Sequence, residues 1–256
     1  HRLATRRGPR RLNMTMARSS LAAWILIGGP IAVFSLWAMF DNTRLYFVTL
    51  LNGLTLASLY FIVASGFTLV FGLMRNVNLA HGSLYMLGGY VGYVVAGWTG
   101  WWLLALAAGF LAAALAGLLM QWGILRHMQG QELRQTMVTI GLSIVVADIL
   151  LWIFTGQVHQ MEAPEWLQGP IRGIPLINAY GAFRLSLLGF GIAIGLFLWW
   201  LLSRTRVGMM IRAGVDDRAM LAAAGVNVNR VFAVTFALGA GLAGFGGVIG
   251  AVELSM

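Results

Sequence analysis

Long apolar runs separated by short polar segments make up most of the chain. The runs cover residues 21–40, 46–74, 79–97, 103–125, 136–155, 185–202 and 231–251. An α-helix needs about 20 mostly apolar residues to cross a hydrocarbon core of about 30 Å. The pattern therefore predicts an all-α protein, a polytopic transmembrane helical bundle with seven spans in this length of chain.

Composition supports a membrane protein and argues against a nucleic-acid-binding one. Of the 256 residues, 59% are hydrophobic and 10% are charged, whereas a soluble domain carries about 25% charged residues. The net charge is +9, and all 17 basic residues are arginines, most of them between apolar runs. Charge in those positions sets membrane topology. Outside the apolar runs, aromatic and basic residues do not combine into a platform for stacking bases.

The arginines also predict the orientation of the chain. With a cytoplasmic N-terminus and seven crossings, fourteen arginines fall inside and three fall outside. The outer three are Arg44, Arg172 and Arg184. The inner group comprises six in the N-terminal tail, Arg75, Arg126, Arg134 and five between residues 204 and 230. This distribution satisfies the positive-inside rule, and one crossing more or fewer would spoil it.

The two ends carry separate expectations. Residues 1–20 form a basic cytoplasmic tail, of which 1–13 fit equally well as sequence upstream of a start at Met14 or Met16. Residues 21–256 form a single transmembrane domain. Its first run lacks a small-residue cleavage site, which favours a span over a signal peptide, and Pro30 should kink that span. An apolar run ends shortly before Met256, so we expect further spans beyond it.

Two loops flank the bundle at opposite faces. The Arg204–Arg230 stretch is a polar interruption between two apolar runs. Gly208 and Gly214 weaken a first short helix, Asp217 suits the N-cap of a second, and Gly225 suits the position that ends it. The prediction is two short helices along the membrane face, although an ordinary amphipathic connector fits the residues equally well. On the other face, three prolines exclude a long helix from 156–184.

A polar cluster opens the third apolar run at Asn78, His81 and Gly82. A helix beginning there, capped by Asn76 or Asn78, would point its amide end at a cavity, and such half-helix ends bind anionic groups such as a substrate carboxylate. A capped helix start at the membrane face is the alternative.

Asp148 lies about two-thirds of the way along an apolar run that also carries Thr139 and Ser143. An ionisable group inside a membrane span normally faces a partner or a polar cavity. The residue spacing leaves two roles open, one in a pore or between helices and one in a structural hydrogen bond to a neighbouring helix.

Several chemistries are excluded or unsupported. The chain has no cysteine and no lysine, so it holds no thiolate metal site, no Walker A lysine and no Schiff-base lysine. Gly239, Gly241 and Gly244 match a dinucleotide fingerprint, but the segment is an apolar helix without a preceding strand, so close helix packing is the better interpretation. The histidines share no metal spacing. We expect no catalytic, cofactor or metal site.

Five blocks of sequence resemble one family. They are G-M-M-I-R-A-G-V-D-D-R-A-M-L-A-A-A-G-V at 208–226, N-G-L-T-L-A-S-L-Y at 52–60, N-L-A-H-G-S at 78–83, T-I-G-L-S-I at 139–144 and the glycine-rich 238–250. The chain is similar in these blocks to inner-membrane permease subunits of ABC importers, most of all the branched-chain amino acid type. The resemblance covers nearly all of the chain from about residue 46 onward.

The resemblance implies a non-catalytic subunit whose ATP and Mg²⁺ are held by partner ATPase subunits. It also implies a second permease subunit, a periplasmic substrate-binding protein, and location in the bacterial inner membrane. The family's coupling segment corresponds here to residues on the Arg204–Arg230 loop, namely Arg212, Asp216, Asp217, Ala222, Ala223 and Gly225. Arg212 and Asp216 stand four residues apart, as a weak ion pair would. Arg218 stands where relatives often have a proline.

Three other functions remain open from the sequence. Urea or a short amide could replace the amino acid as substrate within the same family. An ion-coupled secondary transporter would use Asp148 as its proton or ion site. A non-catalytic membrane scaffold would use none of these residues for transport.

Overall fold

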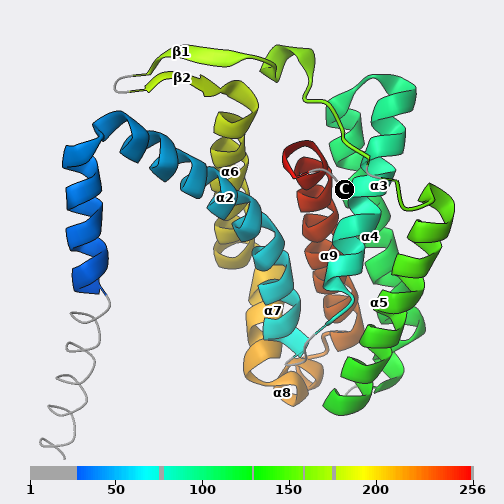
Figure 1. Ribbon diagram of the computed structural model, residues 1–256. Helices are drawn as coiled ribbons and strands as arrows, with labels where there is room; N and C mark the ends of the chain where they lie inside the picture. Colours follow the sequence, from blue (N-terminus) through cyan, green and yellow to red (C-terminus); the bar gives the residue numbers. More distant parts are fainter. Residues whose placement is uncertain (1–27, 75–77, 129, 158, 175–176, 255–256) are drawn as a thin grey trace, which may run out of the picture. The chain divides into compact units, whose positions relative to one another are not determined.

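The computed structural model describes residues 28–74, 78–128, 130–157, 159–174 and 177–254 (Figure 1). The chain divides into two compact units, the smaller formed by residues up to 51 with 172–179 and the larger by residues 52–171 with 180–256. The long elements are the helices α2 (Thr43–Met74), α3 (His81–Thr99), α4 (Trp102–Gly123), α5 (Glu132–Phe154), α6 (Ala182–Arg204) and α9 (Val228–Glu253). The short ones are η1 (Leu125–Met128), η2 (Glu165–Leu167), β1 (Pro170–Ile174), β2 (Ile177–Gly181), α7 (Arg206–Asp216) and α8 (Arg218–Ala223).

The smaller unit contains a helix over residues 28–41 and the first turns of α2. Asn42 separates them, and its side-chain oxygen accepts the backbone N–H of Leu45 at 3.0 Å, which caps the new helix. The whole predicted tail, residues 1–20, and residues 21–27 of the predicted first span lie outside the described residues, whereas Pro30 lies in the first turn of the described helix.

Five of the seven predicted spans are helices long and apolar enough to cross a membrane. They are Thr43–Gly72, Trp102–Gly123, Glu132–Phe154, Ala182–Arg204 and Val228–Glu253. The predicted span at 79–97 is a helix, α3, but it is not among these five, because His81 and its glycines and tyrosines lower the mean hydropathy. The all-α, polytopic class is therefore confirmed by the described residues.

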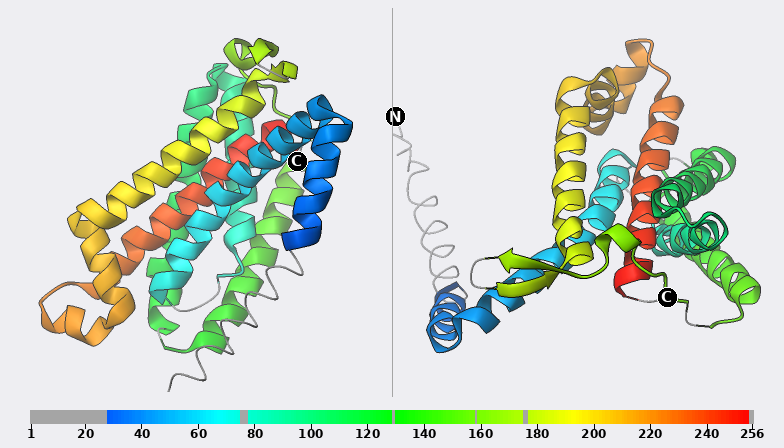
Figure 2. Two further views of the ribbon diagram at one scale, coloured as in Figure 1. Left: turned by 90° about the vertical axis from the view of Figure 1, so that its left-hand side faces the viewer. Right: turned by 90° about the horizontal axis from the view of Figure 1, so that it is seen from above.

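The core of the larger unit is α9, of whose apolar window 72% is buried. Figure 2 shows it between α2 on one side and α3 and α4 on the other. Glycines bring the backbones together: a Cβ added at Gly244 would collide with Gly109 and Ala113 of α4, and one at Gly239 with Gly66 of α2. The predicted role of this glycine-rich segment in close helix packing is confirmed.

The 156–184 segment forms no long helix, as its prolines predict. The described part of it contains η2 and the two-stranded sheet of β1 and β2. The backbone N–H of Met161 donates to the carbonyl oxygen of Ala251 at 3.3 Å, so this loop lies against the end of α9.

Candidate functional site

The polar loop between α6 and α9 folds into the two short helices that its sequence predicts. Thr205 begins α7, with its hydroxyl oxygen accepting the N–H of Gly208 at 3.1 Å. The position of Gly208 requires glycine, because a Cβ there would collide with the backbone of Leu201 and Leu202 in α6. The turn from α6 into α7 is therefore tight and depends on glycine.

The second short helix, α8, is defined by its two ends. Asp217 caps its start, since Oδ1 accepts the N–H groups of Ala219 at 2.8 Å and Met220 at 3.1 Å. At its end, Gly225 has φ +81°, a conformation open to glycine at no steric penalty. Val226 N–H donates to Leu221 O at 3.3 Å and Gly225 N–H to Ala222 O at 3.0 Å, which is a Schellman motif. Both predicted end signals are confirmed.

A small apolar core holds the two helices in place. Ile211 of α7 packs with Val231 and Phe232 of α9, and all three are buried. The guanidinium of Arg218 lies 4.9 Å from the centre of the Phe232 ring, so a cation–π contact fastens the start of α8 to α9. This contact explains how an arginine can stabilise the start of α8, where the family resemblance leads us to expect proline.

The six residues predicted to couple to an ATPase are all exposed, and α7, α8 and the turn after them bring them together. Met220, 69% exposed, and Met209, 54% exposed, lie among them. Exposed methionines beside charged groups form a surface suited to a protein partner. We call α7, α8 and Gly225 the coupling surface. The weak ion pair predicted between Arg212 and Asp216 does not form. Within the described residues, the one ion pair joins Arg184 to Glu253.

The Asn78–Ser83 segment leads into α3, which begins at His81 as predicted. Asn78 does not occupy the N-cap position: its side-chain oxygen accepts the N–H of Ala80 at 3.1 Å, within the turn that precedes the helix. Ala80 occupies the N-cap position without a side-chain hydrogen bond. The cap predicted for Asn78 is therefore wrong, and Asn76 lies outside the described residues.

The polar groups of this segment are buried and bond to neighbouring helices. Leu79 N–H donates to the Thr139 hydroxyl at 3.3 Å, and the Ser83 hydroxyl donates to Ser143 O of α5 at 3.0 Å. His81 Nε2 lies 3.1 Å from the Val63 carbonyl oxygen of α2. A carbonyl only accepts, so Nε2 carries the proton and Nδ1 is left as an acceptor. These bonds join α2, α3 and α5, which fits a structural role.

Two buried atoms of the segment have no hydrogen-bond partner, namely Asn78 Nδ2 and His81 Nδ1. Buried polar atoms are normally satisfied. The pair comprises one donor and one acceptor, so this site has unused capacity for a polar ligand or water. Gly82, by contrast, is exposed.

Asp148 lies elsewhere, on an exposed face of α5. Its carboxylate makes no hydrogen bond or ion pair within the described part of the chain. Met137, Gly141, Ile144 and Trp152 recur with it at intervals of three or four residues and are exposed too, so they share one stripe. Only 11% of the apolar window of α5 is buried. We call this stripe the α5 face.

The predicted substrate-path residues therefore do not meet within one chain. Asn78 and His81 are buried between helices, whereas Asp148 lies on an outer face of α5. Thr139 and Ser143, which share the run with Asp148, are turned toward α3.

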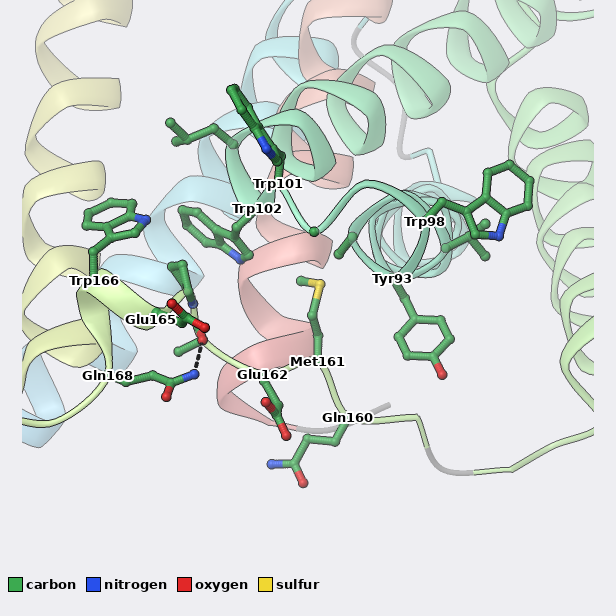
Figure 3. A pocket seen from close by; sticks show the side chains of 17 residues that line it. Tyr93, Trp98, Trp101, Trp102, Gln160, Met161, Glu162, Glu165, Trp166 and Gln168 are labelled. Atoms are coloured by element: carbon green, nitrogen blue, oxygen red, sulfur yellow. Dashed lines mark hydrogen bonds between the residues drawn. The ribbon is translucent and has the colours of Figure 1, made fainter.

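A pocket of about 910 Å³ lies in the larger unit (Figure 3). The elements that line it are at the opposite end of that unit from α7 and α8 (Figure 1). It is formed by the turn between α3 and α4 together with residues 160–168. These two segments lie about 60 positions apart in the sequence, so only the fold brings them together to form a cavity.

These features define a class of protein, a polytopic α-helical membrane protein with an ordered pair of short helices exposed at one end. The chain belongs to the family of branched-chain amino acid transport system permease components, whose model matches residues 49–255.

Its curated relatives carry related names. The chain is 29% identical over 223 residues to the high-affinity branched-chain amino acid transport system permease protein LivH of Escherichia coli, covering 80% of this chain and 70% of the relative. LivH of Salmonella typhimurium is 29% identical over 222 residues with the same coverage. The permease protein BraD of Pseudomonas aeruginosa is 28% identical over 219 residues, again covering 80% and 70%. No solved structure matches the chain.

Proposed function

We propose that this chain is the permease subunit of an ABC importer that moves branched-chain or related hydrophobic amino acids across the bacterial inner membrane. The observation that carries the proposal is the coupling surface. Its two helices are capped at defined residues and held by their own small core, yet their charged and methionine side chains are exposed. An ordered, exposed helix pair of this kind suits a groove in another protein.

The partners follow from this role. Two ATPase subunits would bind ATP and Mg²⁺, and their closure would move the coupling surface and switch the pore between inward- and outward-facing states. A second permease subunit would complete the pore, as a homodimer or heterodimer, and a periplasmic binding protein would deliver substrate. The ATP site would belong to another chain, because this chain has no lysine for a Walker A loop, and this chain would serve as the non-catalytic pore subunit.

The proposed topology has a cytoplasmic N-terminus and seven spans. The five apolar helices, α3 and the run at 21–40 would make these crossings, and the coupling surface would lie in the cytoplasm. The arginine distribution supports this orientation.

The α5 face is the proposed contact with the second permease subunit and borders the substrate path. A carboxylate at the centre of a membrane helix costs about 2.5–3.5 kcal/mol on insertion scales. Asp148 has no partner in the described part of its own chain, so a neighbouring subunit or a water-filled path would have to surround it. There it would attract the ammonium group of an amino acid.

The test is ATP-driven uptake in proteoliposomes containing the complete complex. Gly225→Asp should keep ATPase activity but abolish ATP-driven leucine uptake, since the φ of +81° and the contact surface are both lost. Gly189→Ala is a matched control on α6, where a Cβ meets nothing within 4 Å. Normal uptake with Gly225→Asp would contradict the proposal. Uptake that needs no ATPase would favour a secondary transporter.

A further inference from the structure

The pocket at the end opposite the coupling surface has walls of tryptophan and methionine. Trp98 is 85% exposed, Trp101 70% and Trp166 65%, and all three line it together with Met161. Figure 3 shows these side chains coming from two sides, the α3–α4 turn and the 160–168 segment. Tryptophans around a membrane protein usually form a belt facing lipid. Here three of them line one cavity from two sides, which a belt does not require.

The walls are held in place by the rest of the fold. The Trp102 ring packs at 5.7 Å from Phe183 and 5.9 Å from Phe190, both on α6. The side chain of Gln168 donates to the carbonyl oxygen of Ala163 at 2.6 Å and closes the turn that carries Trp166. The pocket is therefore preformed, and a ligand need not order it.

Trp102 carries an unused hydrogen-bond donor. The residue is only 5% exposed and lines the pocket, yet its indole Nε1 has no hydrogen-bond partner. In Figure 3 the nitrogen edge of the ring is turned toward the side of the pocket where Met161 lies. A buried donor of this kind is costly unless an acceptor reaches it. The acceptor would have to come from a molecule that enters the pocket.

The charged side chains that line the pocket indicate which charge a bound molecule would carry. Glu162 and Glu165 are exposed and line the cavity, whereas no arginine or histidine does. Neither glutamate forms an ion pair within the described residues. Two carboxylates beside the exposed faces of tryptophans favour a cation, which both ion pairing and the ring faces attract. They disfavour the carboxylate of a free amino acid.

We propose that this pocket receives an arginine or lysine side chain from the soluble substrate-binding protein, with a backbone carbonyl of that protein accepting the Trp102 N–H. The 160–168 segment lies beyond the ends of the apolar helices, so a water-soluble partner reaches it more readily than an acyl chain does. Tryptophan paired with a cationic side chain is typical of the few residues that dominate binding energy in protein interfaces. The proposal rests on the proposed transport function.

The experiment measures docking of the purified binding protein encoded beside the permease to the full complex in nanodiscs, by surface plasmon resonance. Glu162→Gln/Glu165→Gln should raise the Kd about tenfold and flatten its dependence on salt. Trp102→Phe should raise the Kd about fivefold, and the thermal stability of the free complex is measured alongside, because the smaller ring packs less fully against Phe183 and Phe190 while an unsatisfied donor is removed. Acetyl-arginine amide should compete, and its neutral isostere acetyl-citrulline amide should not.

Matched controls are Glu132→Gln and Trp199→Phe, which change the same residue types away from the pocket and should leave docking unchanged. Unchanged Kd in both pocket variants would overturn the proposal while leaving ATP-driven uptake, and so the proposed function, intact. If docking instead changes with the phosphatidylethanolamine content of the nanodisc and not with the pocket variants, the proposal is overturned in favour of a lipid site. Leucine binding without the binding protein, abolished by Trp102→Phe, would overturn it in favour of a substrate site.

Discussion

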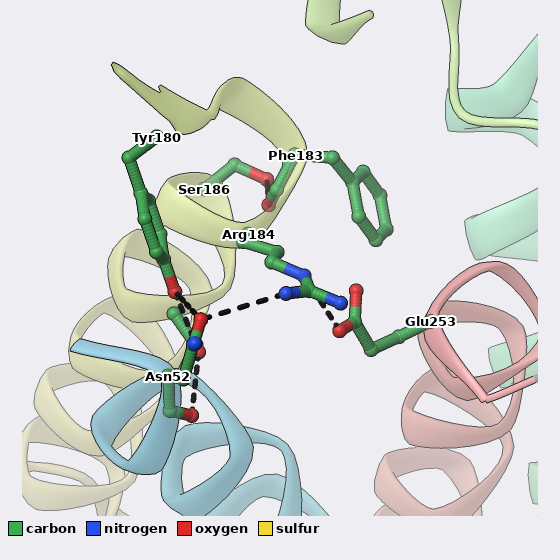
Figure 4. A network of polar contacts seen from close by, with 7 residues as sticks. Asn52, Tyr180, Phe183, Arg184, Ser186 and Glu253 are labelled. Atoms are coloured by element: carbon green, nitrogen blue, oxygen red, sulfur yellow. Dashed lines mark hydrogen bonds and ion pairs between the residues drawn. The ribbon is translucent and has the colours of Figure 1, made fainter. Parts of the chain in front are cut away.

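Arg184 and Glu253 form an ion pair, with Nε of Arg184 2.9 Å from Oε1 of Glu253, that joins the start of α6 to the end of α9 (Figure 4). Asn52 of α2 extends it, since its side-chain oxygen accepts from the Tyr180 hydroxyl at 2.9 Å and lies 3.5 Å from Nη1 of Arg184. Three helices are thus connected at the end that also carries the tryptophan-lined pocket. Arg184, one of the three arginines predicted to lie on the outer side, therefore has a structural role as well.

This pair should make a measurable but modest contribution to stability. Its side chains are 48% and 18% exposed, so we expect a coupling energy of about 0.5–1 kcal/mol. A double-mutant cycle with Arg184→Gln, Glu253→Gln and both together, followed by urea or thermal unfolding in detergent, measures it. Strictly additive single and double variants would show that the pair contributes nothing.

Asp217 should control the order of α8. Asp217→Ala removes the acceptor of two backbone N–H groups and should destabilise the helix by about 1 kcal/mol. Hydrogen exchange at Ala219 and Met220 should accelerate, and substrate-stimulated ATPase activity should fall. Asp217→Asn, which retains a capping oxygen, should restore both.

Asp216 provides the matched control for that prediction. It is equally charged, adjacent and exposed, but it makes no capping bond. Asp216→Ala should leave exchange at Ala219 and Met220 unchanged. Equal exchange in the two alanine variants is incompatible with the capping role of Asp217.

Gly244 should tolerate no side chain. Gly244→Ala places a methyl group against Gly109 and Ala113, and overpacking of this kind costs about 1–3 kcal/mol. The melting temperature of the purified protein should fall. Gly189→Ala, where the space is open, should be neutral or slightly stabilising because alanine favours a helix by about 1 kcal/mol. Similar melting temperatures for the two variants would show that α9 packs less closely than described.

The surroundings of Asp148 can be probed directly, because the chain has no cysteine. Asp148→Cys in the assembled complex should react with a charged, membrane-impermeant thiol reagent if the α5 face borders a water-filled path. Ile149→Cys, also on an exposed position but about 100° further round the helix, should react much more slowly. Equal rates would place Asp148 outside any aqueous path.

Replacing the charge tests the same site functionally. Asp148→Asn should raise the KM for leucine uptake by about tenfold or less through loss of one charge contact, while uptake stays dependent on ATP. Uptake that vanishes with Asp148→Asn and responds to a proton gradient would instead support the ion-coupled alternative.

The sequence by itself determined features whose causes are local. Apolar length alone predicts which helices can span a membrane, since each run must satisfy its own backbone. The ends of α8 also follow from neighbouring residues, because Asp217 and Gly225 act on N–H groups and dihedral angles within a few positions. The glycines of α9 indicated close packing because residues without a side chain let helix backbones approach each other, although the sequence did not say which helices.

Only the tertiary structure decided which distant groups meet. Three features join segments that lie about 57 residues or more apart in the sequence. They are the contacts of Asn78–Ser83 with Thr139 and Ser143, the Arg184–Glu253 pair, and the closure of the tryptophan-lined pocket by residues 160–168. An apolar run seldom specifies which of its faces packs inward, because nearly every position in it is hydrophobic. Packing between helices makes that choice. Helix α5 packs against α3 and leaves Asp148 outside, whereas His81 is buried against α2.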